Sequence, residues 1–173
     1  MHAVARNGPA FWLVLVLLAP VSAAGTAEVG QPAPDFSLPS IHSDYDTVRL
    51  DDLRGKVVVV DFWSSWCAPC RRAMPTLDTL RAAYPRDGLE VVGVNVDPVV
   101  DDGRRFLARA PVSYPNAADT DGDVAARFGV DVLPALFVID RAGIVRGAAS
   151  GGAAGNKERL RAKLVQLVEE GAP

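Results

Sequence analysis

The stretch VVVVDFWSSWCAPC, residues 57–70, decides the fold of this 173-residue chain. Its first part, Val57–Phe62, is apolar except for Asp61, and continuous apolarity is typical of a strand buried on both faces of a sheet. Cys67 and Cys70 follow, and apolar side chains then recur at close to helical spacing up to Tyr84. The stretch therefore predicts a buried strand that leads through a cysteine pair into a helix.

On both sides of this unit the chain alternates between short strands and helices. Ser64 and Ser65 are expected to cap the helix that follows the cysteines, and Asn156 to cap a last helix. Crossovers from strand to helix to strand imply parallel pairing, so we expect an α/β fold with a mixed central sheet and helices on both faces. The other expected elements are an N-terminal β-hairpin (36–38 and 48–50), strands at 89–96, 135–139 and 144–148, and helices at 101–110 and 123–128.

The two cysteines have the spacing of a redox pair. Cys67 falls where the helix should start, and the unpaired N–H groups and the helix dipole there stabilise a thiolate, which is the nucleophilic form. Cys70, one turn later, lies within reach to resolve a mixed disulfide. Pro69 occupies an early helical position, where its missing N–H matters little. A disulfide between the cysteines closes a very small loop, which makes it a weak structural staple.

Three other uses of the cysteines are possible from their spacing alone. They could form a static disulfide, or they could bind copper(I) through two soft thiolates. A closed zinc site would need more ligands, because His42 is the only histidine beyond the first residues of the chain. We therefore expect no metal site.

Two further residues are candidates for the chemistry. Asp61 lies inside the apolar strand, where burial would raise its pKa and let it accept a proton from Cys70 through a water. The alternative is a carboxylate near a strand end that faces solvent. Pro134 precedes a buried strand, and composition does not distinguish a trans from a cis bond there. We expect Trp63 in the core and Trp66 partly exposed beside the sulfurs.

The beginning of the chain is typical of an exported protein. Residues 1–24 combine Arg6, an apolar run from Ala10 to Ala19 and small residues before residue 25. The run is short against the roughly 20 residues that span a bilayer, so we expect a cleaved signal peptide rather than a retained anchor. Residues 25–31 would be a linker and 32–173 the domain. The net charge of -3 argues against a nucleic-acid partner.

Several segments around the cysteines match a known family. They are Gly30–Phe36, Leu53–Trp63, Trp66–Arg71, Met74-Pro75, Val92–Asp97, Phe128–Val130, Leu133-Pro134 and Phe137–Arg141 with Gly143. In this order they resemble the TlpA/ResA-like branch of the thioredoxin superfamily, whose members are exported disulfide reductases.

The resemblance implies a thioredoxin-like fold and assigns places to several residues. Pro134 would be the family's cis proline, packing beside the disulfide and helping to dock the substrate backbone. Asp61 would match the buried Asp of thioredoxins, and Pro98–Asp121 the extra helix-and-strand insertion of this branch. The side chains expected to contact substrate are Trp66, Ala68, Pro69 and Leu133.

The resemblance also implies partners. A membrane reductase of the DsbD or CcdA type would keep the cysteines reduced, and the clients would be apocytochrome c or copper-site proteins of oxidase assembly. We expect a periplasmic or otherwise exported monomer that needs no cofactor.

This sequence departs from the family at three positions. Many ResA-like proteins carry a Glu three residues after the second cysteine, where this chain has Ala73. Thioredoxins pair their buried Asp with a Lys of the next strand, where alignment places Gly93. Any acid–base role therefore falls on Asp61 alone. Leu133 is bulkier than the Thr common before the proline, which would alter the choice of client.

Three other functions remain as alternatives to a reductase. A disulfide oxidase or isomerase of the DsbA kind would use the same cysteines, but such proteins carry a long helical insertion. A thiol peroxidase would have a Thr where this chain has Ser64. A copper(I) chaperone would bind metal without redox turnover.

Overall fold

The computed structural model describes residues 26–42, 46–84, 88–151 and 154–170. The expected signal segment, residues 1–24, lies outside this part, so the expected domain boundaries remain predictions. Among the helices of the described residues, none is both long enough and apolar enough to cross a membrane.

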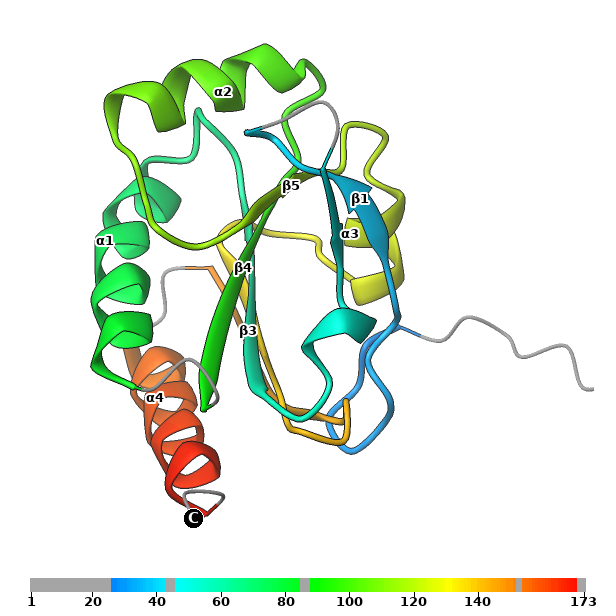
Figure 1. Ribbon diagram of the computed structural model, residues 1–173, viewed down its shortest axis with the longest axis vertical. Coiled ribbons are helices and arrows are strands. Elements are labelled where there is room, and N and C mark those ends of the chain that lie inside the picture. The colour runs from blue at the N-terminus through cyan, green and yellow to red at the C-terminus, as the bar shows by residue number, and fades with distance from the viewer. Residues whose placement is uncertain (1–25, 43–45, 85–87, 152–153, 171–173) are drawn as a thin grey trace, which may run out of the picture.

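The elements follow one another in an alternating α/β order (Figure 1). They are β1 (Ser37–Pro39), β2 (Thr47–Arg49), the 3-10 turn η1 (Asp51–Leu53), β3 (Val57–Trp63), α1 (Ala68–Ala83), β4 (Leu89–Asn95), α2 (Val100–Arg109), β5 (Asn116–Ala118), α3 (Asp123–Phe128), β6 (Ala135–Ile139), β7 (Val145–Ser150) and α4 (Ala154–Glu169).

The central sheet is mixed, with the strand order β5-β4-β3-β6-β7. β3 pairs parallel with β4 and antiparallel with β6, and β4 pairs parallel with β5. β6 and β7 pair antiparallel, while β1 and β2 form a separate antiparallel hairpin. This architecture confirms the expected thioredoxin-like fold, the N-terminal hairpin and the inserted helix and strand, which are α2 and β5.

β3 is the middle strand of the central sheet, and all seven of its residues are buried. Successive side chains of a strand point to opposite faces. Val57, Val59 and Trp63 pack into a core cluster with residues of α1 and α4, whereas Val58 and Val60 pack into a second cluster with residues of α3 and the β-hairpin segments. Figure 1 shows α1 and α4 together on one side of the sheet. Asp61 lies two residues from both Val59 and Trp63 along β3, so its side chain is on their face of the sheet and faces the layer between the sheet and α1.

Two expected helix starts are wrong, and one strand was not expected from periodicity. The N-cap of α1 is Cys67 rather than Ser64 or Ser65, because those serines belong to a turn that the Cys67 N–H closes on the Ser64 carbonyl. α4 begins at Ala154, so Asn156 lies inside the helix. β5 has only three residues and no apolar alternation, and it depends on pairing with β4.

Candidate active site

The two cysteines form a disulfide at the start of α1, with a Cα–Cα distance of 5.3 Å. Cys67 is the N-cap, and its Sγ accepts a hydrogen bond from the Cys70 backbone N–H at 3.2 Å. Cys67 keeps 5% of its surface exposed, whereas Cys70 is fully buried. A thiolate on Cys67 would therefore sit at the positive end of the helix dipole, and Cys67 is the more exposed of the two cysteines.

The residues between and before the sulfurs shape this helix start. Pro69 lies in the first turn of α1, as expected, where a missing N–H leaves no hydrogen bond unmade. Ala68 begins the helix. Trp66 is 69% exposed, which is unusual for the largest apolar side chain and gives the surface beside Cys67 an apolar contact point.

The bond between Leu133 and Pro134 is cis, as the family resemblance implied. Pro134 directly precedes β6, where Ala135 is in register with Phe62 of β3. The proline therefore lies at the end of β3 from which the chain leads to Cys67. Leu133 packs against the core cluster that contains both cysteines, and Val132 beside it is exposed.

Asp61 is fully buried, and neither carboxylate oxygen has a hydrogen-bond partner among the described residues. Its neighbours across the sheet are Gly93 on β4 and Leu136 on β6. Loss of solvation raises its pKa from 3.8 to about 7. The expected burial and raised pKa of this carboxylate are confirmed, and such a group can exchange a proton near neutral pH.

Gly93 leaves no room for the lysine that thioredoxins place beside their buried Asp. A Cβ on Gly93 would lie 2.0 Å from Asn116 Oδ1 and 3.0 Å from Trp63 Nε1. These two side chains share a buried hydrogen bond of 2.9 Å, in which the indole N–H donates. The position next to Asp61 is thus occupied by a neutral pair from β3 and β5, and Ala73 supplies no acid on α1.

A second buried carboxylate, which the sequence analysis missed, holds the loop before Cys67. Asp97 is 1% exposed, and its oxygens accept the Ser65 backbone N–H at 2.9 and 3.2 Å. Asn95 Nδ2 donates to the same carboxylate at 2.9 Å. These bonds tie the turn that carries Cys67 to the end of β4. A polar residue directly after a buried parallel strand was the signal that could have indicated it.

Replacing Asp97 with Ala is expected to lower the free energy of unfolding by about 1–3 kcal/mol, because the partly buried Ser65 N–H and the buried Asn95 amide lose their acceptor. Urea unfolding of the oxidised protein measures this change. Asp101→Ala is the matched control, since its exposed ion pair with Arg104 contributes less than about 1 kcal/mol. Equal losses in the two variants would contradict a structural role for Asp97.

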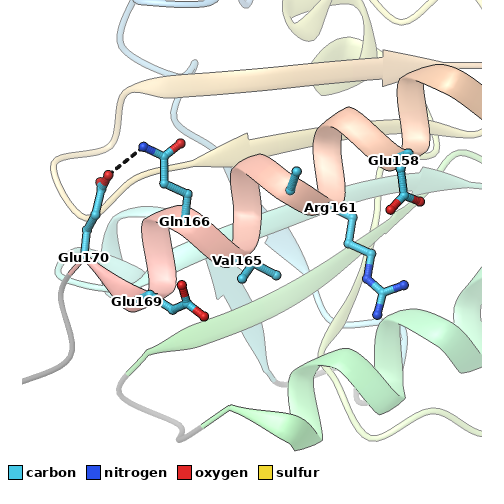
Figure 2. Close-up of a pocket in the computed structure, with 7 residues that line it drawn as sticks. Glu158, Arg161, Val165, Gln166, Glu169 and Glu170 are labelled. Carbon is cyan, nitrogen blue, oxygen red and sulfur yellow. Dashed lines mark hydrogen bonds between the residues drawn. The ribbon is translucent and has the colours of Figure 1, made fainter.

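A surface hollow lies elsewhere, along the outer face of α4 (Figure 2). Charged and polar side chains line it together with Ala162 and Val165, and Gln166 donates a hydrogen bond to Glu170 there. It contains neither cysteine. Disulfide exchange needs an accessible sulfur rather than an enclosing pocket, so the hollow does not compete with the Cys67 region as the candidate site. In the described residues no cluster of His, Cys, Asp and Glu is suited to hold a metal ion.

Comparison with known proteins places this arrangement in a family. Residues 29–148 match the AhpC/TSA family. Thiol-disulfide oxidoreductase ResA of Geobacillus thermodenitrificans is 37% identical over 118 residues, which cover 68% of this chain and 67% of that protein. A Chlorobium tepidum structure assigned as thiol:disulfide interchange protein DsbE is 36% identical and superposes with a TM-score of 0.76, over 83% of this chain and 99% of the other.

A structure from Bacteroides thetaiotaomicron, assigned as a protein disulfide isomerase, is 27% identical with a TM-score of 0.72, over 84% of this chain and 92% of that one. The relatives share disulfide chemistry, and the family match spans more than half of the chain. The chain therefore belongs to the AhpC/TSA family and is a thiol-disulfide oxidoreductase of the thioredoxin superfamily, similar to ResA and DsbE.

Proposed function

We propose that this protein is an exported reductase of client disulfides, with Cys67 as the attacking cysteine and Cys70 as the resolving one. The observation that carries the assignment is the asymmetry of the pair. Cys67 is the N-cap of α1 and retains exposure, while Cys70 is fully buried. A client can approach the first sulfur only, and the helix start favours its thiolate.

The reaction proceeds in two exchanges. The Cys67 thiolate attacks one sulfur of the client disulfide, forms a mixed disulfide and releases the other client sulfur as a thiolate, which takes up a proton. The Cys70 thiolate then attacks Cys67 Sγ and releases the second client thiol. The client gains two electrons, and the enzyme is left with the Cys67–Cys70 disulfide that the structure contains.

Asp61 is the proposed proton acceptor for Cys70 in the second exchange. Its strand position faces the core cluster that contains both cysteines, and its pKa of about 7 suits proton transfer at neutral pH. The transfer would run through a water, as expected from the sequence. Because Gly93 and Ala73 supply no alternative acid or base, this role rests on one side chain.

The docking surface for the client would consist of the exposed or half-buried residues around Cys67. Trp66 offers an apolar face, and the segment of Leu133 and Pro134 offers backbone at the same end of the sheet. Ala68 and Pro69, which lie between the two cysteines, would complete this surface. This combination is suited to an extended, unfolded client rather than to a small molecule.

Export and partners complete the proposal. Residues 1–24 would direct the chain out of the cytoplasm as a signal peptide, with 25–31 as a linker. A membrane reductase of the DsbD or CcdA type would reduce the Cys67–Cys70 disulfide after each turnover. The clients would be apocytochrome c or copper-site proteins of oxidase assembly, as the family resemblance implies.

The redox potential of the pair tests the direction of electron flow. Equilibration with glutathione or thioredoxin, followed by quantification of the Cys67–Cys70 disulfide, is expected to give roughly -200 to -270 mV, in the range of reductants. A value near about -120 mV, typical of a strong oxidant, would reverse the proposed direction and favour a disulfide oxidase.

A further inference from the structure

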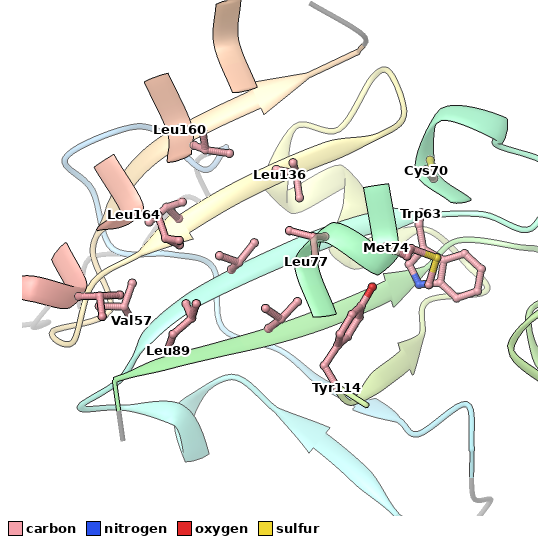
Figure 3. Packing of buried hydrophobic residues seen from close by; sticks show 14 of the residues in the cluster. Val57, Trp63, Cys70, Met74, Leu77, Leu89, Tyr114, Leu136, Leu160 and Leu164 are labelled. Atoms are coloured by element: carbon pink, nitrogen blue, oxygen red, sulfur yellow. The ribbon is translucent and has the colours of Figure 1, made fainter. Parts of the chain in front are cut away.

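A buried tyrosine that the mechanism above does not use lies in the layer of Asp61. Tyr114 is 1% exposed and belongs to the core cluster that includes Cys67 and Cys70. Its hydroxyl has no hydrogen-bond partner among the described residues. Figure 3 shows its ring between the sheet and α1, with the hydroxyl pointing toward Met74 and Leu77. A buried phenol in this state requires an explanation.

The sheet register places Tyr114 near Asp61. Asp61 is in register with Gly93, and Gly93 with Asn116, so these positions form one row across three strands. Tyr114 precedes Asn116 by two residues and packs into the cluster of Val59 and Trp63, on the face that Asp61 shares. Asn116 Nδ2 donates to the Tyr114 carbonyl at 3.0 Å, which fixes the backbone of this segment.

The other groups of this layer leave Asp61 without a charged partner. Asn116 uses its oxygen for Trp63. β4 and β6 contribute Gly93 and Leu136 beside Asp61, and α4 and α2 contribute leucines. Arg81 of α1 is paired with Glu90 of β4. At the α1 side of the layer, Cys67 and Cys70 are joined in the disulfide, and Asp78 of α1 accepts hydrogen bonds from Ser113.

We propose that the Tyr114 hydroxyl is the hydrogen-bond donor that supports ionised Asp61 through one bridging water, in place of the lysine that Gly93 excludes. Water is the usual link between buried polar groups that are beyond direct contact. Tyr114 would be a positioning residue, because it acts on the reaction through Asp61. The inference rests on the proposed function of Asp61 as the proton acceptor for Cys70.

Electrostatics supports the donor role. Burial raises the pKa of Tyr114, and the negative charges of Asp61 and Asp78 raise it further. The phenol thus remains protonated at every pH at which Asp61 titrates. A neutral donor stabilises the carboxylate without placing a second charge in the core.

Tyr114→Phe removes the hydroxyl and keeps the ring. We expect the pKa of Asp61, followed by carboxyl NMR in the oxidised protein, to rise by about one pH unit, which is a tenfold change in the ratio of carboxylate to carboxylic acid at a given pH. The pH midpoint of mixed-disulfide resolution, measured in single turnovers, should rise by the same amount. Resolution at pH 7 should be roughly fivefold slower, because the ionised fraction of Asp61 falls from about one half to about one tenth.

Two controls keep the result specific. Tyr84→Phe, at a half-buried tyrosine on the C-cap of α1, should leave both midpoints unchanged. Ser64→Ala removes the other buried hydroxyl that has no partner among the described residues, and it should also leave them unchanged. A shift with Ser64→Ala and none with Tyr114→Phe would overturn the proposal.

The double variant Asp61→Asn/Tyr114→Phe separates this inference from the function of Asp61. If Tyr114 acts through Asp61, the double variant should resolve mixed disulfides no more slowly than Asp61→Asn alone. Additive losses would mean that Tyr114 acts independently and would refute the inference only. An unchanged pH profile in Asp61→Asn itself would instead refute the role of Asp61, and the inference with it.

Discussion

Cys67→Ser is expected to reduce turnover of a disulfide substrate by at least about 10³-fold. A serine hydroxyl is not ionised near neutral pH, and it cannot form the mixed disulfide through which the exchange passes. Insulin reduction, or consumption of glutathione disulfide with a recycling reductant, measures the loss.

Cys70→Ser provides the matched comparison. It should also end steady-state turnover, but it should still release one equivalent of thiol in a single burst, because Cys67 remains able to attack. Cys67→Ser should give no burst. Turnover that persists in Cys67→Ser, or a burst that appears in Cys67→Ser and not in Cys70→Ser, would show that Cys67 is not the attacking cysteine.

Asp61→Asn is expected to change the free energy of unfolding of the oxidised protein in a pH-dependent way. The change should be more favourable at pH 8 than at pH 3.5 by roughly 4 kcal/mol. In the folded protein burial raises the pKa of this carboxyl from 3.8 to about 7. The neutral amide of Asn has nearly the same shape and does not titrate. Any effect of the amide on the free energy of unfolding that does not depend on pH is the same at both pH values, so it cancels in the comparison.

The sign follows from proton uptake. Between pH 3.8 and about 7 the folded state holds the Asp61 proton and the unfolded state does not, so the wild-type protein loses stability as the pH rises through this window. The loss is complete above the folded pKa. The disulfide keeps both cysteines from titrating, so the difference between the two proteins reports Asp61.

The same substitution should slow catalysis. Without a proton acceptor for Cys70, resolution of the mixed disulfide should fall roughly 10²-fold at pH 7. Urea unfolding across the pH range and single-turnover kinetics measure the two effects. Asp52→Asn, at an exposed position of η1, is the control that should change neither. Parallel stability curves for wild type and Asp61→Asn would contradict the raised pKa.

Much of the fold could be predicted because the strongest local patterns agree with the tertiary structure. The continuous apolarity of Val57–Phe62 reflects a strand buried on both faces, and the structure places it as β3 at the centre of the sheet. The segments predicted at Asp123–Phe128 and Ala135–Ile139 have the same bounds in the structure. In each case nearby residues determine the element.

The remaining features depend on partners distant in sequence. β5 forms because Asn116–Ala118 pairs with β4, and its own residues show no strand pattern. The cap of α1 is Cys67 because Asp97, thirty-two residues from Ser65, holds the preceding turn. Tyr114 and Asp61 share a layer only because three strands align. Periodicity contains no information on such contacts, so the sequence indicated the cysteines, Asp61 and Pro134 but not Asp97 or Tyr114.

Trapping tests the central claim most directly. In its own cell, Cys70→Ser should accumulate mixed disulfides between Cys67 and client proteins, which non-reducing electrophoresis resolves and mass spectrometry identifies. The account predicts that these species are abundant in Cys70→Ser and absent in Cys67→Ser. Equal amounts in the two variants, or none in either, would contradict Cys67 as the sulfur that attacks client disulfides.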